Sequence, residues 1–250
     1  MTLLDGFSTA QIVVAVVAVL LAAVVRGLTG FGFGFLLTPI LALALAPVQA
    51  VLLVNVLAFS LALAEVRYVL REGHRSALWI SAFLLLTVMP GLLLLSAIPA
   101  QYGRVLIALA ALTAFVIVVL PRRNHADAAP PGKLATGATG LIAGVATGFA
   151  AMPGISVVPY YVRQPMPRVM AKASMIGIFG VSALASLAAG AVSGLLEWRL
   201  LAFGVLLFPV MALGNWLGSL VFGRVSDPVW RTSVGLVLGA AALAALVKLF

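Results

Sequence analysis

Long apolar stretches, separated by short polar or glycine- and proline-rich breaks, follow one another along the chain. A helix rises about 1.5 Å per residue, so about 20 apolar residues make a helix that can cross a bilayer. On this basis we expect apolar segments at residues 8–26, 31–46, 48–70, 76–97, 104–121, 134–150, 153–162, 168–192, 198–222 and 229–249. The pattern predicts an all-α fold, a polytopic integral membrane helical bundle.

One hydrophilic stretch divides these ten segments into two sets of five. Residues 122–133 combine basic and acidic residues with proline and glycine, which is typical of a solvated linker. We therefore predict a first membrane repeat at residues 1–121, a hydrophilic linker at 122–133 and a second membrane repeat at 134–250.

The two halves show signs of an internal duplication. A shift of 120 residues places matching residues on one another at Gly34/Gly154, Pro39/Pro159, Pro47/Pro167 and Phe59/Phe179. Chance matches are common in a chain so rich in Leu, Ala and Gly, but these fall around two glycine breaks. Paired interruptions in corresponding halves indicate a transporter site. We expect two pseudo-symmetric repeats, each with a Gly/Pro-broken segment.

Composition places the chain in a bilayer. Apolar residues make up 64% of the 250 residues and charged residues 8%, whereas a soluble domain has roughly 25% charged residues. The mean hydropathy is +1.25. The net charge of +9 comes from basic residues scattered between apolar segments rather than gathered in a stripe, so we expect no nucleic-acid partner.

The positions of the basic residues predict a topology. If all ten segments cross and the N-terminus is outside, twelve of the 15 Lys and Arg residues lie on one face. If 31–46 and 153–162 re-enter instead, the split is eight to seven. The positive-inside bias favours the first arrangement, in which five segments per half make the repeats inverted. Segment 153–162 is about 15 Å long as a helix, too short to cross unaided, so crossing or re-entry is left open for these two segments.

The first glycine break, Gly27-Leu-Thr-Gly-Phe-Gly-Phe-Gly-Phe35, alternates phenylalanine with glycine. An extended segment would place the rings on one side and bare backbone on the other. Its amides could then bind an anion, helped by the positive end of a helix beginning near residues 37–39, with Pro39 in its first turn. Alternatively, Gly30 and Gly34, four residues apart, let two helices pack closely.

The second break, at residues 148–154, repeats this chemistry in the other half. It contains Pro153 and Gly154, and Ser156 and Pro159 follow. We expect the two breaks to meet at a site near the middle of the membrane.

Ionisable residues within membrane segments are functional candidates. Arg26 leads, because it directly precedes the first break and a guanidinium can face an anion there. Its alternative role is to extend to the membrane interface. Lys172 is the candidate of the second half. Glu65 either carries a coupling proton or forms an interfacial ion pair with Arg67 and Arg71.

Polar side chains that could line a path are Thr29, Thr38, Gln49, Asn55, Thr147, Ser156, Ser174 and Asn215. The residues expected to bind the anion are Arg26, Thr29, Gly30, Gly32, Gly34, Pro39, Asn55, Pro153, Gly154, Ser156, Pro159, Lys172 and Ser174.

Enzymatic chemistry has no candidate residues in this chain. Its two histidines, His74 and His125, fall in loops, and cysteine is absent. Gly154-Ile-Ser156 has no histidine to activate the serine, and no phosphate-binding P-loop is present. We expect no catalytic residue, no cofactor and no metal.

The stretch Arg26-Gly-Leu-Thr-Gly-Phe-Gly-Phe-Gly-Phe-Leu-Leu-Thr-Pro39, followed by Pro47, resembles the first-repeat signature of the sulfite exporter family called TauE/SafE. The block from Gly148 to Tyr161 resembles the second-repeat turn of that family, although Ala150, Ala151 and Met152 make it poorer in glycine. The resemblance implies a multi-pass permease of the bacterial inner membrane for small sulfur-containing anions such as sulfite, sulfoacetate or related sulfonates. It also implies coupling to an ion gradient, of protons or sodium, rather than to ATP. Members of this family are usually given seven to nine helices, so the ten segments expected here exceed that number.

These observations predict a secondary transporter of small anions that works by alternating access at a midplane site. Two alternatives stay open: an anion channel or a permease for another solute class, and a non-transporting membrane assembly factor. The expected partners are the lipid bilayer and a small anion. The identity of the anion, the direction, the coupling ion and homo-oligomerisation are left open.

Overall fold

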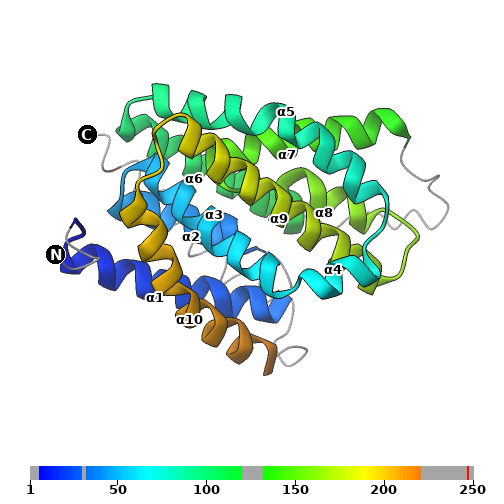
Figure 1. Ribbon diagram of the computed structural model, residues 1–250, viewed down its shortest axis with the longest axis horizontal. Coiled ribbons are helices and arrows are strands. Elements are labelled where there is room, and N and C mark those ends of the chain that lie inside the picture. Colours follow the sequence, from blue (N-terminus) through cyan, green and yellow to red (C-terminus); the bar gives the residue numbers. More distant parts are fainter. Residues whose placement is uncertain (1–5, 30–31, 120–131, 221–246, 248–250) are drawn as a thin grey trace.

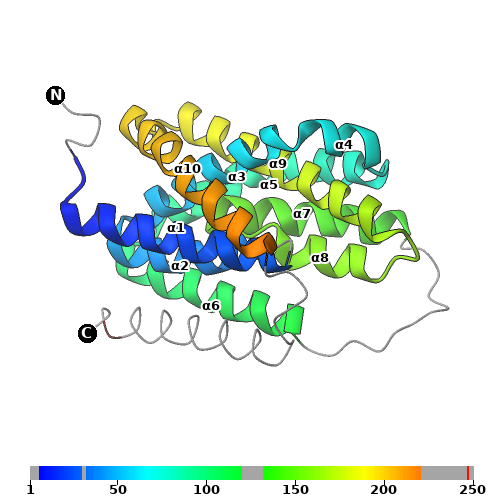
Figure 2. The same ribbon diagram turned by 90° about the horizontal axis from the view of Figure 1, so that it is seen from below.

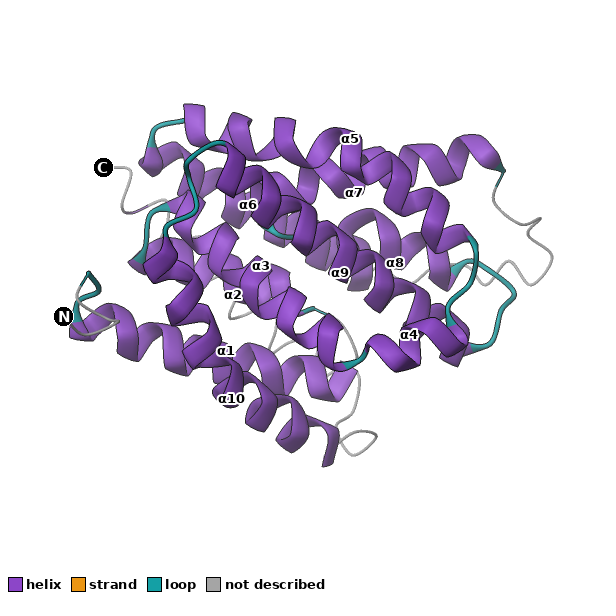
Figure 3. Ribbon diagram, in the orientation of Figure 1, coloured by secondary structure: helices purple, strands orange, loops and turns teal. Residues whose placement is uncertain are grey.

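The computed structural model describes residues 6–29, 32–119, 132–220 and 247, and within these residues it contains helices and no strand (Figure 3). The helices are α1 (Thr9–Thr29), α2 (Phe33–Ala44), α3 (Pro47–Ala64), α4 (Val66–Glu72), α5 (Ser76–Ala97), α6 (Ala100–Val119), α7 (Lys133–Ala150), α8 (Gly154–Val162), α9 (Arg168–Val192) and α10 (Trp198–Leu220). The prediction of an all-helical membrane bundle is confirmed. Segment 229–249 and linker residues 122–131 lie outside the described residues, while Gly132 precedes α7 and Lys133 begins it.

The long helices lie roughly along one axis, so the loops gather at two ends (Figures 1 and 2). At the end where α4 lies, on the right in Figure 1, the Tyr68 hydroxyl donates to the Val169 carbonyl at 2.9 Å. Ser76 and Tyr161 also share a hydrogen bond of 2.8 Å there. We call this the basic end, because it carries the exposed side chains of Arg67, Arg71, Arg75, Lys133, Arg163, Arg168 and Lys172.

The opposite end collects the connections at residues 45–46, 98–99 and 193–197. Gln11 of α1 donates to the Ala44 carbonyl at 2.9 Å, and Arg104 of α6 donates to the Ala42 carbonyl at 2.8 Å. Both bonds hold the C-terminal end of α2 beside the start of α1 and α6.

Six helices, α1, α3, α5, α6, α9 and α10, are long and apolar enough to cross a membrane. Large apolar side chains stand exposed on them, as in Leu86 at 67% and Val205 at 61%. Exposed aromatic rings lie near their ends, where membrane proteins place Trp and Tyr: Trp79, Tyr102, Trp198 and Trp216. The exposed apolar surface therefore faces lipid.

The helix pairs α5/α7 and α1/α10 pack closely through glycine. A Cβ added at Gly140, Gly144 or Gly148 of α7 would meet backbone carbonyls of α5. Gly214 and Gly218 of α10 lie equally close to carbonyls of α1. In both pairs the contacts advance together along the two sequences, so the paired helices run parallel. Small residues at i, i+4 spacing serve this close approach.

The structure corrects the sequence-based expectation in three places. The predicted segment 48–70 is two helices, interrupted at Glu65, whose φ and ψ are −98° and 8°. Helix α2 begins at Phe33 rather than near 37–39, so Phe33 to Phe35 form a helical turn rather than an extended ladder. Pro39 consequently lies inside α2 and not in its first turn.

A glycine explains the early start of α2. Gly32 has φ +96°, in the left-handed region that favours glycine, and it turns the chain directly into the helix. Neither glycine nor proline marks the interruption at Glu65.

Candidate functional site

The second break has a defined backbone geometry. Helix α7 ends at Ala150, and the C-cap residue Ala151 takes the left-handed conformation with φ 54° and ψ 37°. The Ala151 amide donates to the Thr147 carbonyl at 2.8 Å and the Met152 amide to the Ala146 carbonyl at 3.1 Å. This is a helix C-cap of the kind usually built with glycine, and α8 begins at Gly154 directly after it.

The two breaks touch each other through backbone. Gly34, in the first turn of α2, lies against the carbonyl oxygen of Ala151, and a Cβ at Gly34 would overlap that oxygen. The 120-residue shift pairs Gly34 with Gly154. In the structure, Gly34 of the first break packs on the turn that directly precedes Gly154 of the second break. The expectation that the breaks meet agrees with this contact.

A cavity of about 80 Å³ lies where the breaks meet. Its wall comes from the first turn of α2, from residues 151–155, from one side each of α3 and α9, and from Ala114 of α6. Most lining side chains are apolar. The polar ones among the described residues are Arg26, Asn55 and Ser182.

Both short helices begin at this cavity. The first turn of any helix leaves amides without intrahelical acceptors, and its N-terminus has a partial positive charge. Neither Gly32, which precedes α2, nor Pro153, which precedes α8, provides a side-chain cap. Two uncapped N-termini therefore adjoin one cavity, an arrangement suited to an anion.

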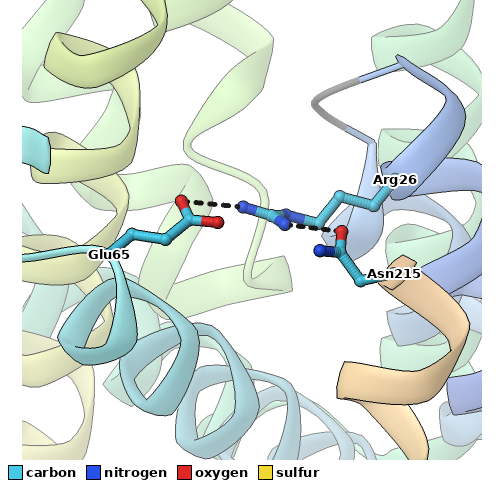
Figure 4. Close-up of polar contacts among 3 residues, drawn as sticks. All are labelled: Arg26, Glu65 and Asn215. Atoms are coloured by element: carbon cyan, nitrogen blue, oxygen red, sulfur yellow. Dashed lines mark hydrogen bonds and ion pairs between the residues drawn. The ribbon is translucent and has the colours of Figure 1, made fainter. Parts of the chain in front are cut away.

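Arg26 adds a full positive charge to the cavity wall. It lies near the end of α1, and its side chain is 12% exposed. Its Nη1 donates to Asn215 Oδ1 of α10 at 2.9 Å, and its Nη2 lies 3.6 Å from Glu65 Oε2 (Figure 4). The partner of Glu65 is thus Arg26 from α1, not the neighbouring arginines of α4.

Asn55 of α3 is held rigidly beside the cavity. It is 2% exposed, and its Nδ2 donates to the Val51 carbonyl at 2.9 Å and to Ser186 Oγ at 3.1 Å. The second bond ties α3 to α9 across the cavity region.

The structure brings about half of the expected anion-binding residues together. Those that line the cavity are Arg26, Gly32, Gly34, Asn55, Pro153 and Gly154. Thr29 ends α1, but its side chain and the whole of Gly30 lie outside the described residues.

Five other expected residues do not line this cavity, for separate reasons. Pro39 and Pro159 lie inside α2 and α8. Ser156 Oγ donates to the Thr139 carbonyl at 3.0 Å, away from the cavity wall. Ser174 Oγ donates to the Met170 carbonyl and accepts the His74 amide, both at 2.8 Å, and Lys172 is exposed near the basic end.

Sequence reasoning missed Ser182 of α9 as a cavity residue. The 120-residue shift pairs Ser182 with Ala62, and both line the cavity. The same shift could have found this position. Nothing local in the sequence pairs Arg26 with Asn215, which lies 189 residues away.

Comparison with known proteins gives one family. No curated protein and no solved structure matches the chain. Residues 15–245 match the family described as sulfite exporter TauE/SafE. The match covers nearly the whole chain, including both breaks and every helix that lines the cavity. The chain therefore belongs to the sulfite exporter TauE/SafE family and is a membrane transporter.

Proposed function

We propose that this protein is a secondary transporter of small anions, sulfite or organosulfonates, and that it works by alternating access at the cavity between the two breaks. One observation carries the proposal: Arg26 and the uncapped N-termini of α2 and α8 converge on a single cavity. Positive potential from three sources in a low-dielectric surrounding favours a small negative ion over a neutral solute.

The size of the cavity is consistent with such a substrate. A cavity needs a volume of about 10–15 Å³ to hold one water molecule, so a cavity of about 80 Å³ holds a few water molecules or one small oxyanion. The largely apolar wall, which includes Phe33, Phe35 and Phe179, suits an anion whose charged group is joined to a small apolar part. A sulfonate has this form.

The course of the two broken helices supports alternating access. From the cavity, α2 leads to the opposite end, where Arg104 binds its Ala42 carbonyl. From the same cavity, α8 leads to the basic end, where Tyr161 bonds Ser76. Two half-length helices that leave one site in opposite directions are what inverted repeats require.

The charge distribution supports an orientation. The basic end carries most of the described Lys and Arg residues, so by the positive-inside rule it faces the cytoplasm. In a bacterial inner membrane, α1 then begins on the outer side. The homo-oligomeric state does not enter this proposal.

The test is anion binding and flux for Arg26→Ala, with Arg71→Ala as the matched control. Arg71 is exposed on α4 and does not line the cavity, so its removal takes away the same charge elsewhere. A ligand that binds the folded state at 100 times its Kd stabilises it by about 2.7 kcal/mol, which a thermal-shift screen of small anions in detergent detects. We expect Arg26→Ala to insert normally but to lose both the thermal shift and the flux, and Arg71→Ala to retain both.

Other outcomes would favour other functions. Unchanged flux in Arg26→Ala rejects the role of this residue. Flux that does not saturate with concentration favours an anion channel. Stabilisation by neutral solutes alone favours a permease for another solute class. Absence of any ligand-dependent stabilisation and flux favours a membrane assembly factor.

A further inference from the structure

Arg26 adjoins both the cavity and a carboxylate. Its side chain lines the cavity, and its Nη2 lies 3.6 Å from Glu65 Oε2. Glu65 itself does not line the cavity, although Leu61 and Ala62 just before it do. Figure 4 shows the guanidinium reaching between Glu65 on one side and Asn215 on the other. The Arg26 guanidinium therefore lies between the Glu65 carboxylate and the cavity where we place the anion.

The ion pair between these residues is incompletely bonded. A separation of 3.6 Å exceeds the usual 2.7–3.2 Å of an N–H···O hydrogen bond. Glu65 Oε2 is buried and has no hydrogen-bond partner among the described residues. Asn215, in contrast, holds Nη1 at 2.9 Å. The guanidinium is therefore anchored by a neutral amide, and its remaining donors can exchange one acceptor for another.

An anion at Arg26 would change the charge balance at Glu65. The Arg26 side chain is 12% exposed and that of Glu65 28%. Two negative groups would then share one guanidinium, and like charges so close together repel each other. Protonation of the Glu65 carboxylate removes that repulsion, forming one O–H bond and leaving Arg26 to the anion. We propose that Glu65 takes up a proton when the anion binds, so that the proton is the coupling ion and Glu65 its carrier; this rests on the anion site proposed above.

The coupling is reciprocal by thermodynamic necessity. If anion binding strengthens proton binding at Glu65, protonation of Glu65 strengthens anion binding by the same factor. The empty site holds the Arg26–Glu65 pair, and the loaded site holds anion and proton together with no change in net charge relative to that pair. Loading the site in this way leaves no uncompensated charge beside Arg26.

The other described charged groups near Glu65 lie toward solvent. On its own segment, Arg67, Arg71 and Glu72 are exposed, and Tyr68 directs its hydroxyl to Val169 of α9. Helix α9, which packs on α3 and α4, carries Arg168 and Lys172, both exposed at the basic end. From α1 and α10 the facing groups are Arg26 and the neutral Asn215. Among the residues that the structure describes, Arg26 is the charge that Glu65 contacts directly.

The test measures proton uptake together with anion binding on the purified full-length protein. The probe is methanesulfonate, which keeps one negative charge across the neutral and mildly acidic range, so that any proton taken up belongs to the protein. In weakly buffered detergent solution, a pH-sensitive dye reports uptake as methanesulfonate is added, and calorimetry gives the Kd at several pH values. For wild type we expect about one proton per anion and a Kd that weakens about tenfold for each unit of rising pH.

Two variants assign the proton. Glu65→Gln imitates the protonated carboxyl, so we expect it to bind methanesulfonate at least as tightly as wild type, without proton uptake and without pH dependence. Glu72→Gln, an exposed carboxylate on α4, is the matched control and should keep the uptake and the pH dependence of wild type.

The outcomes separate this inference from the proposed function. Wild-type binding that needs Arg26 but takes up no proton overturns proton coupling and leaves the anion site standing. Proton uptake that persists in Glu65→Gln, or folded Glu65→Gln that no longer binds, overturns the assignment to Glu65. If wild type binds no methanesulfonate at any pH, the anion site is refuted and the coupling with it. The wild-type measurement needs no variant, so misfolding of Glu65→Gln does not prevent a decision.

Discussion

Gly34→Ala tests whether the two breaks are in backbone contact. Gly34 lies in the first turn of α2, and its added Cβ would overlap the Ala151 carbonyl oxygen. That oxygen cannot easily move, because the Ala151 and Met152 amides hold the turn in place. They donate hydrogen bonds of 2.8 and 3.1 Å to carbonyls in the last turn of α7. The substitution therefore has to separate α2 from the second break.

The expected loss of stability in Gly34→Ala follows from the rigidity of the contact between Gly34 and Ala151. Overpacking a well-packed interior by one methyl group costs about 1–3 kcal/mol, and a backbone neighbour places the cost in the upper part of that range. Gly154→Ala is the matched control, because Gly154 begins the other broken helix. Its added Cβ would lie 3.5 Å from Val158 and 3.7 Å from Phe179, which is ordinary contact. Alanine is also a better helix former than glycine by up to about 1 kcal/mol.

The assay is the free energy of unfolding in mixed detergent micelles, measured beside methanesulfonate binding and flux. We expect Gly34→Ala to lose about 2 kcal/mol of stability and most of its binding, because the wall of the cavity moves. Gly154→Ala should match wild type in stability within about 1 kcal/mol. A Gly34→Ala protein as stable and as active as wild type would refute the contact and the proposed site geometry that depends on it.

Two further predictions concern the second break and the topology. Ala151→Gly should raise the free energy of unfolding by about 1 kcal/mol in the same assay. The φ of 54° at Ala151 is a left-handed conformation that costs a residue with a Cβ about that much. Equal or lower stability of the variant would contradict this left-handed geometry. Because the chain has no cysteine, Gly73→Cys and Glu197→Cys can each be labelled alone with a membrane-impermeant maleimide in vesicles. Both positions are exposed in loops at opposite ends of the bundle, so they should label from opposite sides of the membrane, and labelling from one side would contradict the inverted arrangement. Glu197 is preferred to Gly194, whose φ of +68° disfavours a cysteine.

Helix positions were predictable wherever the signal was local. Segments 76–97 and 168–192 match α5 and α9 residue for residue, because charges, proline or glycine stand at or just beyond their limits. The break at Glu65 was not predictable in this way. Neither glycine nor proline marks it, and Glu65 lies opposite Arg26 from α1, a partner that only the folded chain supplies.

The candidate site was predictable in part. Arg26, Gly34 and Gly154 were identified because a charge in a membrane segment and glycine in an apolar run are costly and therefore informative. Lys172 and Ser156 fitted the same reasoning but do not line the cavity. A helix residue's position in sequence does not settle which way its side chain points when the helix is packed on more than one side.

The sequence by itself determined the membrane class, the approximate limits of most described helices, the two breaks and the family, because hydropathy and the backbone properties of glycine act within a few residues. Only the tertiary structure decided that Gly34 packs on Ala151, that both short helices begin at one cavity, and that Arg26 is shared between that cavity, Glu65 and Asn215. These contacts join residues as far as 189 positions apart. They depend on how the helices pack in space, which the local pattern of apolar and polar residues does not specify.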